Sequence, residues 1–351
     1  MSKLFEALTL GELDLKNRVI MAPLTRARSP GRVPTPDVAR YYAQRAGAGL
    51  IISEATSVDP MGVGYADTPG IWSQEQVEAW SKVTQAVHEK DGKIVLQLWH
   101  VGRISDPSFL DGKKPVAPSA IAAQGEVSLL RPKRPYPEPR ALTTEEVAEV
   151  VEQFRLGAEN AKKAGFDGVE IHGANGYLVD QFLQDGSNQR TDRYGGSIEN
   201  RARFALEVTD AVVSVWGPGR VGMHLAPRCD THDMGDSDPK ALFTYLAQQL
   251  GERGIAFICL REHEAEDSLA PYILKAFGGP LLLNEGFEKE TAEKAVAEGR
   301  ADAVAFGRPY IANPDLAERF QQDADLNEPD YSTFYEGGRK GYLDYPTLAT
   351  V

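Results

Sequence analysis

The stretch Phe166-Asp-Gly-Val-Glu-Ile-His-Gly-Ala-Asn-Gly-Tyr-Leu178 begins as a short apolar run and ends as a polar loop. The apolar part predicts a buried strand, and His172, Asn175 and Tyr177 then follow within six positions, separated by small residues. His and Asn side chains can both donate a hydrogen bond to one substrate oxygen, and a Tyr hydroxyl can deliver a proton where negative charge develops. The ordinary alternatives are a core histidine, a turn asparagine and a packed tyrosine, so the rest of the chain decides between the two interpretations.

Similar apolar runs recur along the whole chain. Near-continuous apolar runs, as opposed to strict alternation, are typical of parallel strands that are buried on both faces. The eight runs are 19–22, 49–52, 94–98, 168–171, 221–225, 255–258, 280–283 and 303–306. Amphipathic stretches with helix signals separate them, at 73–88, 143–164, 197–215, 239–251, 290–298 and 315–320. Eight strands that alternate with helices predict an α/β fold, the (β/α)8 TIM barrel, in which loops at the carboxyl ends of the strands carry the chemistry.

The N-terminal residues 4–19 mix apolar and polar positions around Gly11 and predict a β-hairpin. We expect this hairpin to close the bottom of the barrel. Because α/β barrels of this length often form one unit, the sequence predicts a single domain spanning residues 1–351. The connections 102–142 and 180–197 are long, and long connections are often functional loops or lids.

Composition excludes several classes of partner. The formal net charge of −13 disfavours nucleic acid and anionic membrane surfaces as main partners. The two cysteines, Cys229 and Cys259, provide neither a disulfide framework nor a zinc motif, and no metal site is expected. Cys259 ends an apolar run and is predicted to be a buried thiol. Without a signal-peptide pattern or a run of eighteen apolar residues, we expect a cytoplasmic protein.

Two glycine-containing loops predict a phosphate site. No Gly-x-Gly-x-x-Gly turn opens a helix after a strand, so a Rossmann dinucleotide site is not indicated. Barrels instead often bind a phosphate with the loops after strands seven and eight. Here these loops are Asn284-Glu-Gly-Phe287 and Phe306-Gly-Arg-Pro309, in which Gly286 and Gly307 free the backbone and Arg308 adds a charged fork. Taken alone, this pair of loops also fits sugar-phosphate enzymes.

Other strand ends carry polar groups that suit a flat heterocycle. Thr25 follows the first strand, and Gln97 lies in the third, two positions before Trp99. An amide and a hydroxyl at a barrel mouth can bind a ring that has donors and acceptors along its edge, as a flavin has. The alternatives are a polar residue in a barrel layer, which is uncommon without a partner, and a tryptophan that only packs.

With these residues in place, the chain resembles the Old Yellow Enzyme family of FMN-dependent ene-reductases. The matching stretches follow the family's order across nearly the whole chain, and within the family they look most like bacterial xenobiotic, N-ethylmaleimide and nitrate-ester reductases. They are residues 17–26, 95–100, 102–104, 170–178, 188–201, 303–308, 311–316 and 341–346.

The resemblance implies a role for each site residue. His172 and Asn175 would hold the activating oxygen of the substrate over the flavin, and Tyr177 would be the proton donor. Noncovalent FMN would be bound by Pro23, Leu24, Thr25, Ala55, Gln97, His172, Asn175, His224, Asn284, Gly286, Gly307 and Arg308. The substrate pocket would be lined by Tyr65, Trp99, His172, Asn175 and Tyr342.

The implied activity is a ping-pong reaction. NADPH or NADH would reduce the flavin, and an electron-poor alkene (an enone, maleimide or nitroalkene) would then take its place and accept hydride. Nitrate esters and nitroaromatics are further candidates, and a monomer or homodimer is expected. The rival interpretations are a barrel lyase for a sugar phosphate, which would need a Schiff-base lysine or a carboxylate cluster, and a flavin-binding protein with a degenerate site.

The sequence departs from the family at two positions. His224 stands where the family usually has an arginine facing the negative edge of the reduced flavin. Glu285 replaces a small residue of the phosphate loop, and we expect its carboxylate to point away from the phosphate that it would otherwise repel.

Overall fold

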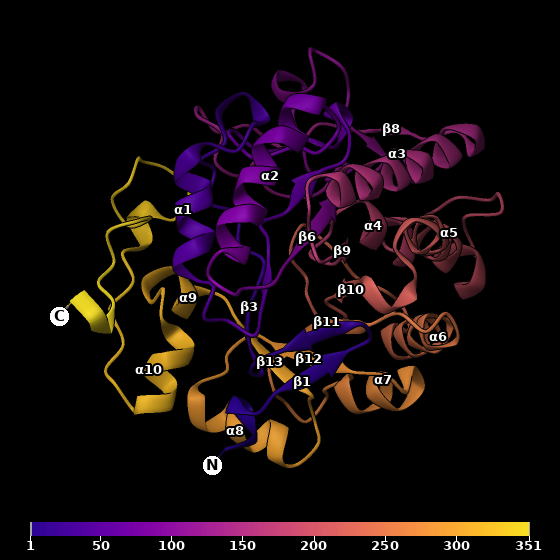
Figure 1. The fold of residues 1–351 in the computed structure, drawn as a ribbon. Coiled ribbons are helices and arrows are strands. Elements are labelled where there is room, and N and C mark those ends of the chain that lie inside the picture. Colours follow the sequence, from indigo (N-terminus) through magenta and orange to yellow (C-terminus); the bar gives the residue numbers. More distant parts are fainter. Residues whose placement is uncertain (1, 351) are drawn as a thin grey trace.

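The computed structural model of the chain describes residues 2–350, which form a closed barrel of eight parallel strands (Figure 1). The strand order is β4-β3-β13-β12-β11-β10-β9-β6, and pairing of β4 with β6 closes the ring. The barrel strands are β3 (Val19–Met21), β4 (Leu50–Ile52), β6 (Ile94–Trp99), β9 (Gly168–Gly173), β10 (Val221–Leu225), β11 (Phe257–Arg261), β12 (Leu281–Asn284) and β13 (Ala303–Phe306). The predicted (β/α)8 barrel is therefore confirmed.

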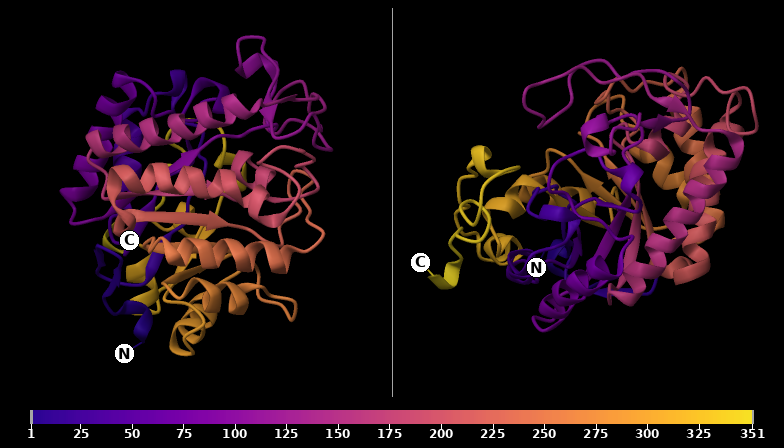
Figure 2. Two further views of the ribbon diagram at one scale, coloured as in Figure 1. Left: turned by 90° about the vertical axis from the view of Figure 1, so that its right-hand side faces the viewer. Right: turned by 90° about the horizontal axis from the view of Figure 1, so that it is seen from above.

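Helices surround the strands on the outside of the barrel, and α3, α5 and α6 lie next to one another in Figure 2. The helices are α1 (Pro36–Gln44), α2 (Gln74–His88), α3 (Thr144–Lys163), α4 (Leu178–Leu183), α5 (Ile198–Trp216), α6 (Pro239–Glu252), α7 (Ala270–Phe277), α8 (Lys289–Ala297), α9 (Arg308–Ala312) and α10 (Leu316–Gln322). The predicted capping start of α3 is present, because Thr143 accepts from the Glu146 N–H and the Glu146 carboxylate accepts from the Thr143 N–H. Such reciprocal bonds satisfy two N–H groups that have no partner within the helix.

The N-terminal hairpin closes the bottom of the barrel as expected. It consists of β1 (Leu8–Leu10) and β2 (Leu13–Leu15), and its buried leucines pack with barrel residues such as Ile20 and Leu282. Gly11 turns the hairpin at φ 58°, and a Cβ there would lie 2.4 Å from the carbonyl oxygen of Gly219, just before β10. A side chain at this position would push the hairpin away from the barrel end.

The long connection 102–142 is ordered around a buried arginine. Arg103 is 1% exposed and donates hydrogen bonds to the carbonyls of Ile121, His232 and Asp233. Two short strands in this connection, β7 (Val116–Ala117) and β8 (Arg140–Ala141), pair in parallel. One guanidinium thus fastens this connection to the loop after β10, beside the mouth of the barrel.

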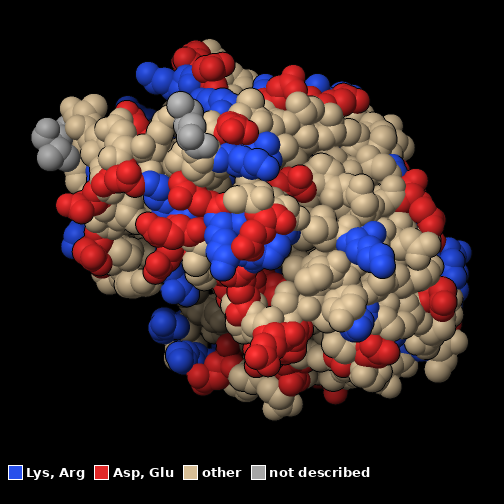
Figure 3. Space-filling view, turned by 90° about the horizontal axis from the view of Figure 1, so that it is seen from below, with Lys and Arg blue, Asp and Glu red and all other residues tan. Residues whose placement is uncertain are grey.

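The outer surface mixes charges of both signs, and Figure 3 shows acidic and basic side chains next to one another over one face. Within residues 2–350, no helix has the length and apolar character needed to cross a membrane. Both cysteines are free, and Cys259 is buried as predicted.

Candidate functional site

A cavity of about 990 Å³ lies at the carboxyl ends of the barrel strands. Its volume falls within the range of roughly 300–1,000 Å³ that is usual for small-molecule and cofactor sites. All predicted site residues except Tyr342 contribute to its wall, namely Pro23, Leu24, Thr25, Ala55, Tyr65, Gln97, Trp99, His172, Asn175, Tyr177, His224, Asn284, Gly286, Gly307 and Arg308. Residues that are far apart in the sequence, from Pro23 to Arg308, therefore meet in one cavity.

His172 is set up as a neutral hydrogen-bond donor. It is the fifth residue of β9, and its Nδ1 accepts a hydrogen bond from the Ala174 N–H at 3.3 Å, so the ring proton belongs on Nε2. Burial lowers the pKa of His172 well below its usual value, and the neighbouring His224 and Arg261 lower it further. The imidazole is therefore uncharged at neutral pH and can donate one hydrogen bond through Nε2.

Asn175 is held by contacts on both sides. Its backbone is left-handed, with φ 60°, a region that Asn tolerates better than most residues. Its carbonyl oxygen accepts from His232 Nδ1 at 2.6 Å, and its side-chain Oδ1 accepts from Arg261 Nη1 at 2.8 Å. Since Oδ1 is engaged by Arg261, the amide group has its Nδ2 donor available to the cavity.

Tyr177 presents a protonated hydroxyl beside this pair. Its ring meets the rings of His172 and Trp99 edge to face, with centroids 5.0 Å away in both cases. Its hydroxyl oxygen lies 2.9 Å from that of Tyr65, so the two groups share a hydrogen bond. Burial raises the pKa of the Tyr177 phenol above its usual value. The hydroxyl therefore keeps its proton at neutral pH and can act as a general acid.

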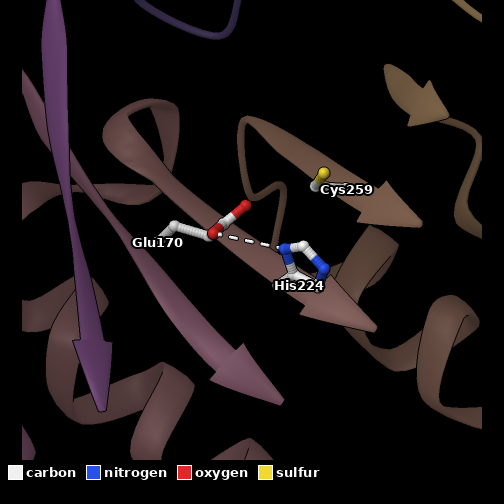
Figure 4. Close-up of side chains that lie close together, drawn as sticks. All are labelled: Glu170, His224 and Cys259. Atoms are coloured by element: carbon white, nitrogen blue, oxygen red, sulfur yellow. Dashed lines mark ion pairs between the residues drawn. The ribbon is translucent and has the colours of Figure 1, made fainter. Parts of the chain in front are cut away.

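A buried polar cluster lies deeper in the barrel (Figure 4). Gln97 Nε2 donates to Glu170 Oε2 at 2.7 Å, while His224 Nδ1 lies 3.5 Å from the same oxygen, an ion-pair separation too long for a good hydrogen bond. Polar atoms of Glu170, His224 and Cys259 lie within 4.8 Å of one another. Neither ring nitrogen of His224 has a hydrogen-bond partner within residues 2–350, although the side chain is 3% exposed.

Buried polar atoms without a partner in the protein are suited to bind the polar edge of a ligand. A buried polar group without a partner costs free energy, and His224 lines the cavity together with Gln97. A ring that offers an acceptor to His224 would remove that cost. The pyrimidine edge of a flavin has such acceptors, so the deep end of the cavity fits the isoalloxazine ring.

The predicted phosphate loops lie next to each other. Asn284 Nδ2 donates to the carbonyl oxygen of Ala305 at 2.7 Å, which ties the end of β12 to β13. Gly286 has φ 78° and leaves open space where a Cβ would stand. Arg308 begins α9 directly after Gly307. Backbone N–H groups and one guanidinium are the groups that bind a single phosphate, so this end of the cavity fits the phosphate of FMN.

The carboxylate of Glu285, which lines the same cavity, is paired with a cation. Its carboxylate forms an ion pair with Arg261, with Oε1 3.0 Å from Nη2. The negative charge is thus compensated by a neighbouring cation and does not oppose a phosphate at Gly286 or Arg308. The backbone of Glu285 has φ 89°, an uncommon conformation for a residue with a side chain.

The prediction that Tyr342 lines the pocket is corrected by the structure. Tyr342 is 1% exposed, is stacked on Tyr41 of α1 at a centroid distance of 4.3 Å, and is absent from the cavity wall. Arg26 and Arg28 lie over its ring, at 5.1 and 4.5 Å. Tyr342 therefore belongs to a buried aromatic–arginine cluster that supports the C-terminal segment.

Two other tyrosines of that segment line the cavity instead. They are Tyr331 and Tyr335, which are 60% and 47% exposed at its mouth. Arg26 and Arg28 hold the segment by donating to backbone carbonyls of residues 333, 334, 336, 338 and 341. The sequence motif around Tyr342 pointed to the correct segment but to the wrong tyrosine.

Arg261 is the principal site residue that the sequence interpretation missed. It ends β11 and lines the cavity, where it contacts both Asn175 and Glu285. Its signal was present in the sequence, because a charged residue directly after the apolar run Phe257-Ile-Cys-Leu260 marks the carboxyl end of a barrel strand. His232, which fixes the Asn175 carbonyl, lies in a loop and had no such signal.

Comparison with known proteins shows the family to which the chain belongs. A sequence model of the NADH:flavin oxidoreductase / NADH oxidase family matches residues 3–327. The chain belongs to this family of flavin enzymes, the Old Yellow Enzyme family. It is thus an FMN-dependent oxidoreductase of the ene-reductase kind, with a nicotinamide as reductant.

Several relatives are similar over nearly their whole length. The 12-oxophytodienoate reductase 1 of Oryza sativa subsp. japonica is 46% identical, over 97% of this chain and 92% of its own. Morphinone reductase, in a complex with tetrahydroNAD, is 50% identical, with a TM-score of 0.95 over 98% of this chain and 97% of that one. The old yellow enzyme homologue of Zymomonas mobilis is 45% identical, with a TM-score of 0.96 over 98% and 99%. None of these three is named as a maleimide or nitrate-ester reductase, so that narrower branch stays a prediction.

Proposed function

We propose that this protein reduces the C=C bond of electron-poor alkenes, with enones, maleimides and nitroalkenes as substrates and NADPH or NADH as the reductant. The observation that carries the proposal is the convergence of two neutral donors and one protonated phenol on one cavity: His172 Nε2, Asn175 Nδ2 and the Tyr177 hydroxyl. Two donors bind a single oxygen, and the phenol lies beside them to supply a proton. This arrangement suits a conjugate acceptor that carries a carbonyl or nitro group.

The cofactor is proposed to occupy the two ends of the cavity already described. Pro23, Leu24, Thr25, Ala55, Gln97 and His224 would contact its ring, and Asn284, Gly286, Gly307 and Arg308 its phosphate. When bound, FMN supplies the hydride that reaches the β-carbon of the alkene. The wall formed by Trp99 and Tyr65, whose rings stack at 5.6 Å, would guide the substrate over the flavin.

His172 and Asn175 would draw electron density from the alkene by donating to its oxygen, which makes the β-carbon electrophilic. Because both donors are fixed before the substrate arrives, no reorganisation is needed as negative charge develops on that oxygen. Tyr177 would donate its proton to the α-carbon, and its hydrogen bond with Tyr65 keeps the hydroxyl oriented. The new C–H bond at the α-carbon forms as the O–H bond of Tyr177 breaks.

The names of the relatives support an unsaturated oxo compound as the substrate class, since they specify the reduction of 12-oxophytodienoate and of morphinone. Nitrate esters and nitroaromatics could use the same two donors through a nitro-group oxygen, and they remain the second class to test. A sugar-phosphate lyase of the Schiff-base kind is disfavoured because no lysine lies among the residues that line the cavity.

A substrate panel on the purified holoenzyme tests the proposal. The protein should be yellow, release FMN on heating, and oxidise NADPH or NADH in the presence of 2-cyclohexenone, N-ethylmaleimide and a nitroalkene. Parallel assays with a nitrate ester and a nitroaromatic define the second class, and size-exclusion chromatography with light scattering decides between monomer and homodimer. Bound FAD, or turnover of none of the alkenes by an FMN-loaded enzyme, would refute it.

A further inference from the structure

Arg261 connects three elements that meet at the cavity. It ends β11, its Nη1 donates to Oδ1 of Asn175 in the loop after β9, and its Nη2 donates to Glu285 in the loop after β12. Arg261 and Asn175 are 86 residues apart in the sequence, so their contact exists only through the fold. The side chain is 30% exposed and forms part of the cavity wall.

The contact with Asn175 decides which end of the amide faces the cavity. An asparagine side chain can turn either its oxygen or its nitrogen toward a ligand, and the two ends have opposite hydrogen-bonding character. Because a guanidinium has donors and no acceptor, only the amide oxygen can face Arg261. None of the hydrogen bonds within residues 2–350 uses the amide nitrogen of Asn175, so this donor is left for a ligand.

The same contact strengthens that donor. A hydrogen bond with a charged donor is stronger than one between neutral groups. Hydrogen bonds that are linked in a chain also polarise one another. Electron density drawn toward Oδ1 by Arg261 makes the Nδ2 hydrogens more positive. A ligand oxygen at Nδ2 therefore meets a better donor than an isolated amide.

Glu285 holds Arg261 in place for this task. Its φ of 89° costs free energy for a residue with a Cβ, and such conformations persist where the surroundings favour them. Its carboxylate forms an ion pair with the Arg261 guanidinium. By neutralising the guanidinium, Glu285 also makes Arg261 a poor site for an anionic ligand.

We propose that Arg261 is a positioning residue for substrate binding: it orients and polarises the Asn175 amide so that Nδ2 donates to the activating oxygen. The inference rests on the proposed function, in which Asn175 binds that oxygen, and it adds a residue that acts through Asn175 without touching the substrate. Removing Arg261 would release the amide to turn its oxygen toward the substrate, where two oxygens would repel each other.

The test measures ligand binding without turnover. Isothermal titration calorimetry gives the dissociation constant of 2-cyclohexenone for the oxidised, FMN-loaded enzyme in the wild type, Asn175→Ala, Arg261→Met and the double variant. We expect Arg261→Met to weaken binding about tenfold, as for the loss of one hydrogen bond to a charged group. In the Asn175→Ala background, the same substitution should change the constant less than about twofold, since coupled residues are non-additive.

Two further variants keep the test informative if Arg261→Met binds flavin poorly. Arg261→Lys keeps the charge but lacks the planar fork that reaches both partners, so its affinity should lie between those of the wild type and Arg261→Met. Glu285→Gln keeps an acceptor for Arg261 and should change the affinity less than about threefold. Arg228→Met is the matched control, because Arg228 pairs with Glu262 and Asp267 and is not part of the cavity wall.

The outcomes separate this inference from the proposed function. If Asn175→Ala binds 2-cyclohexenone as well as the wild type does, the proposed role of Asn175 is wrong, and with it the inference. If Asn175→Ala weakens binding but Arg261→Met and Arg261→Lys do not, only the inference is overturned. Additive losses in the double variant would mean that Arg261 contacts the ligand directly, which also overturns it.

Discussion

The polar atoms that face the cavity differ in how completely the chain itself satisfies them. Asn175 and Tyr177 each have a protein partner at one side-chain atom, and these contacts fix how the two side chains are oriented. His224 has no hydrogen-bond partner at either ring nitrogen within residues 2–350. This difference is what we would expect if Asn175 and Tyr177 bind a substrate that comes and goes and His224 binds a ligand that stays.

Replacing Tyr177 with Phe removes the proposed proton donor and keeps the ring that packs on His172 and Trp99. A positioned general acid contributes about 10²–10⁴-fold to a rate, so we expect reduction of an enone to slow by about that factor. A nitroalkene should slow less, because its product can persist as a nitronate without a proton at carbon. Stopped-flow absorbance on NADPH-reduced enzyme measures both rates.

Tyr272→Phe is a suitable control for Tyr177→Phe, since Tyr272 is 45% exposed and outside the cavity wall. Flavin reduction by NADPH should change little in both variants, because that half of the reaction needs no proton from Tyr177. An enone rate that is unchanged in Tyr177→Phe would assign the proton to water or to another residue.

Replacing His224 with Ala should shift the flavin midpoint potential to more negative values. The reduced flavin carries more negative charge at its pyrimidine edge, and a donor at that edge stabilises it. Losing one hydrogen bond to a charged group, about 1.5–3 kcal/mol, corresponds to roughly 30–60 mV for a two-electron couple. Dye-equilibrated reductive titration of each variant measures the potential.

His224→Arg is the informative counterpart, because it introduces the residue that the family usually has. A permanent positive charge at the end of this side chain should make the potential more positive than in the wild type. Potentials that are equal in the wild type, His224→Ala and His224→Arg would show that His224 does not face the flavin.

At the level of elements, apolar runs located the strands well. Each predicted barrel strand is found within a few residues; the largest shift is at β11, which starts at Phe257 although the apolar run starts at Ile255. Helices α1 and α7 were not predicted, because each is short and has a proline in its first turn, which also fits a loop. Helix α4 was not predicted either, because a helix of six residues is too short to show a clear periodicity. It lies in the segment that was predicted to connect the strand 168–171 to the helix 197–215.

The site was predictable to the extent that it lies at strand ends, and no further. Thr25, Gln97 and His172 could be located because each follows or interrupts an apolar run. The contacts of Arg261 with Asn175 and of Tyr65 with Tyr177 join positions 86 and 112 residues apart. Such pairings depend on how loops pack, and no spacing in the sequence encodes them.

Helix α4 contains a buried carboxyl group whose titration should be measurable as stability. Asp180 accepts hydrogen bonds from the Gly176 N–H and from Gln184, and burial raises the pKa of its carboxyl to about 7. The unfolded chain loses this proton near pH 3.9. Between those pH values the folded state binds more protons, so the free energy of unfolding falls as the pH rises, by up to about 1.4 kcal/mol per pH unit.

Asp180→Asn should remove this part of the pH dependence, since the amide keeps an acceptor but has no charge to desolvate. We expect its unfolding temperature to match that of the wild type near pH 4 and to exceed it at pH 8. Asp210→Asn, on an exposed ion pair with Arg253, is the control. A parallel pH profile for Asp180→Asn and wild type would contradict the raised pKa.

For the whole molecule, the barrel brings the two ends of the cavity together from distant parts of the chain. Strands β6, β9, β10 and β11 supply the deep polar cluster, and β12 and β13 lead into the predicted phosphate loops. A ligand that spans both ends joins several strands at the barrel mouth, so its binding should stabilise the entire fold. A ligand that binds only the folded state stabilises it by RT ln(1 + [L]/Kd).

Arg308→Met tests that coupling by separating the phosphate from the ring. We expect FMN to bind about 10–100-fold more weakly to the variant, as for the loss of charged hydrogen bonds, whereas riboflavin, which has no phosphate, should bind equally to both proteins. The unfolding temperature of the wild type should therefore rise more with FMN than with riboflavin, and the variant should show a smaller difference. Flavin fluorescence titration and differential scanning calorimetry measure the two effects.

Arg300→Met, which removes a surface ion pair with Glu264, is the matched control. Equal weakening of FMN and riboflavin by Arg308→Met would mean that Arg308 supports the barrel mouth without contacting the phosphate.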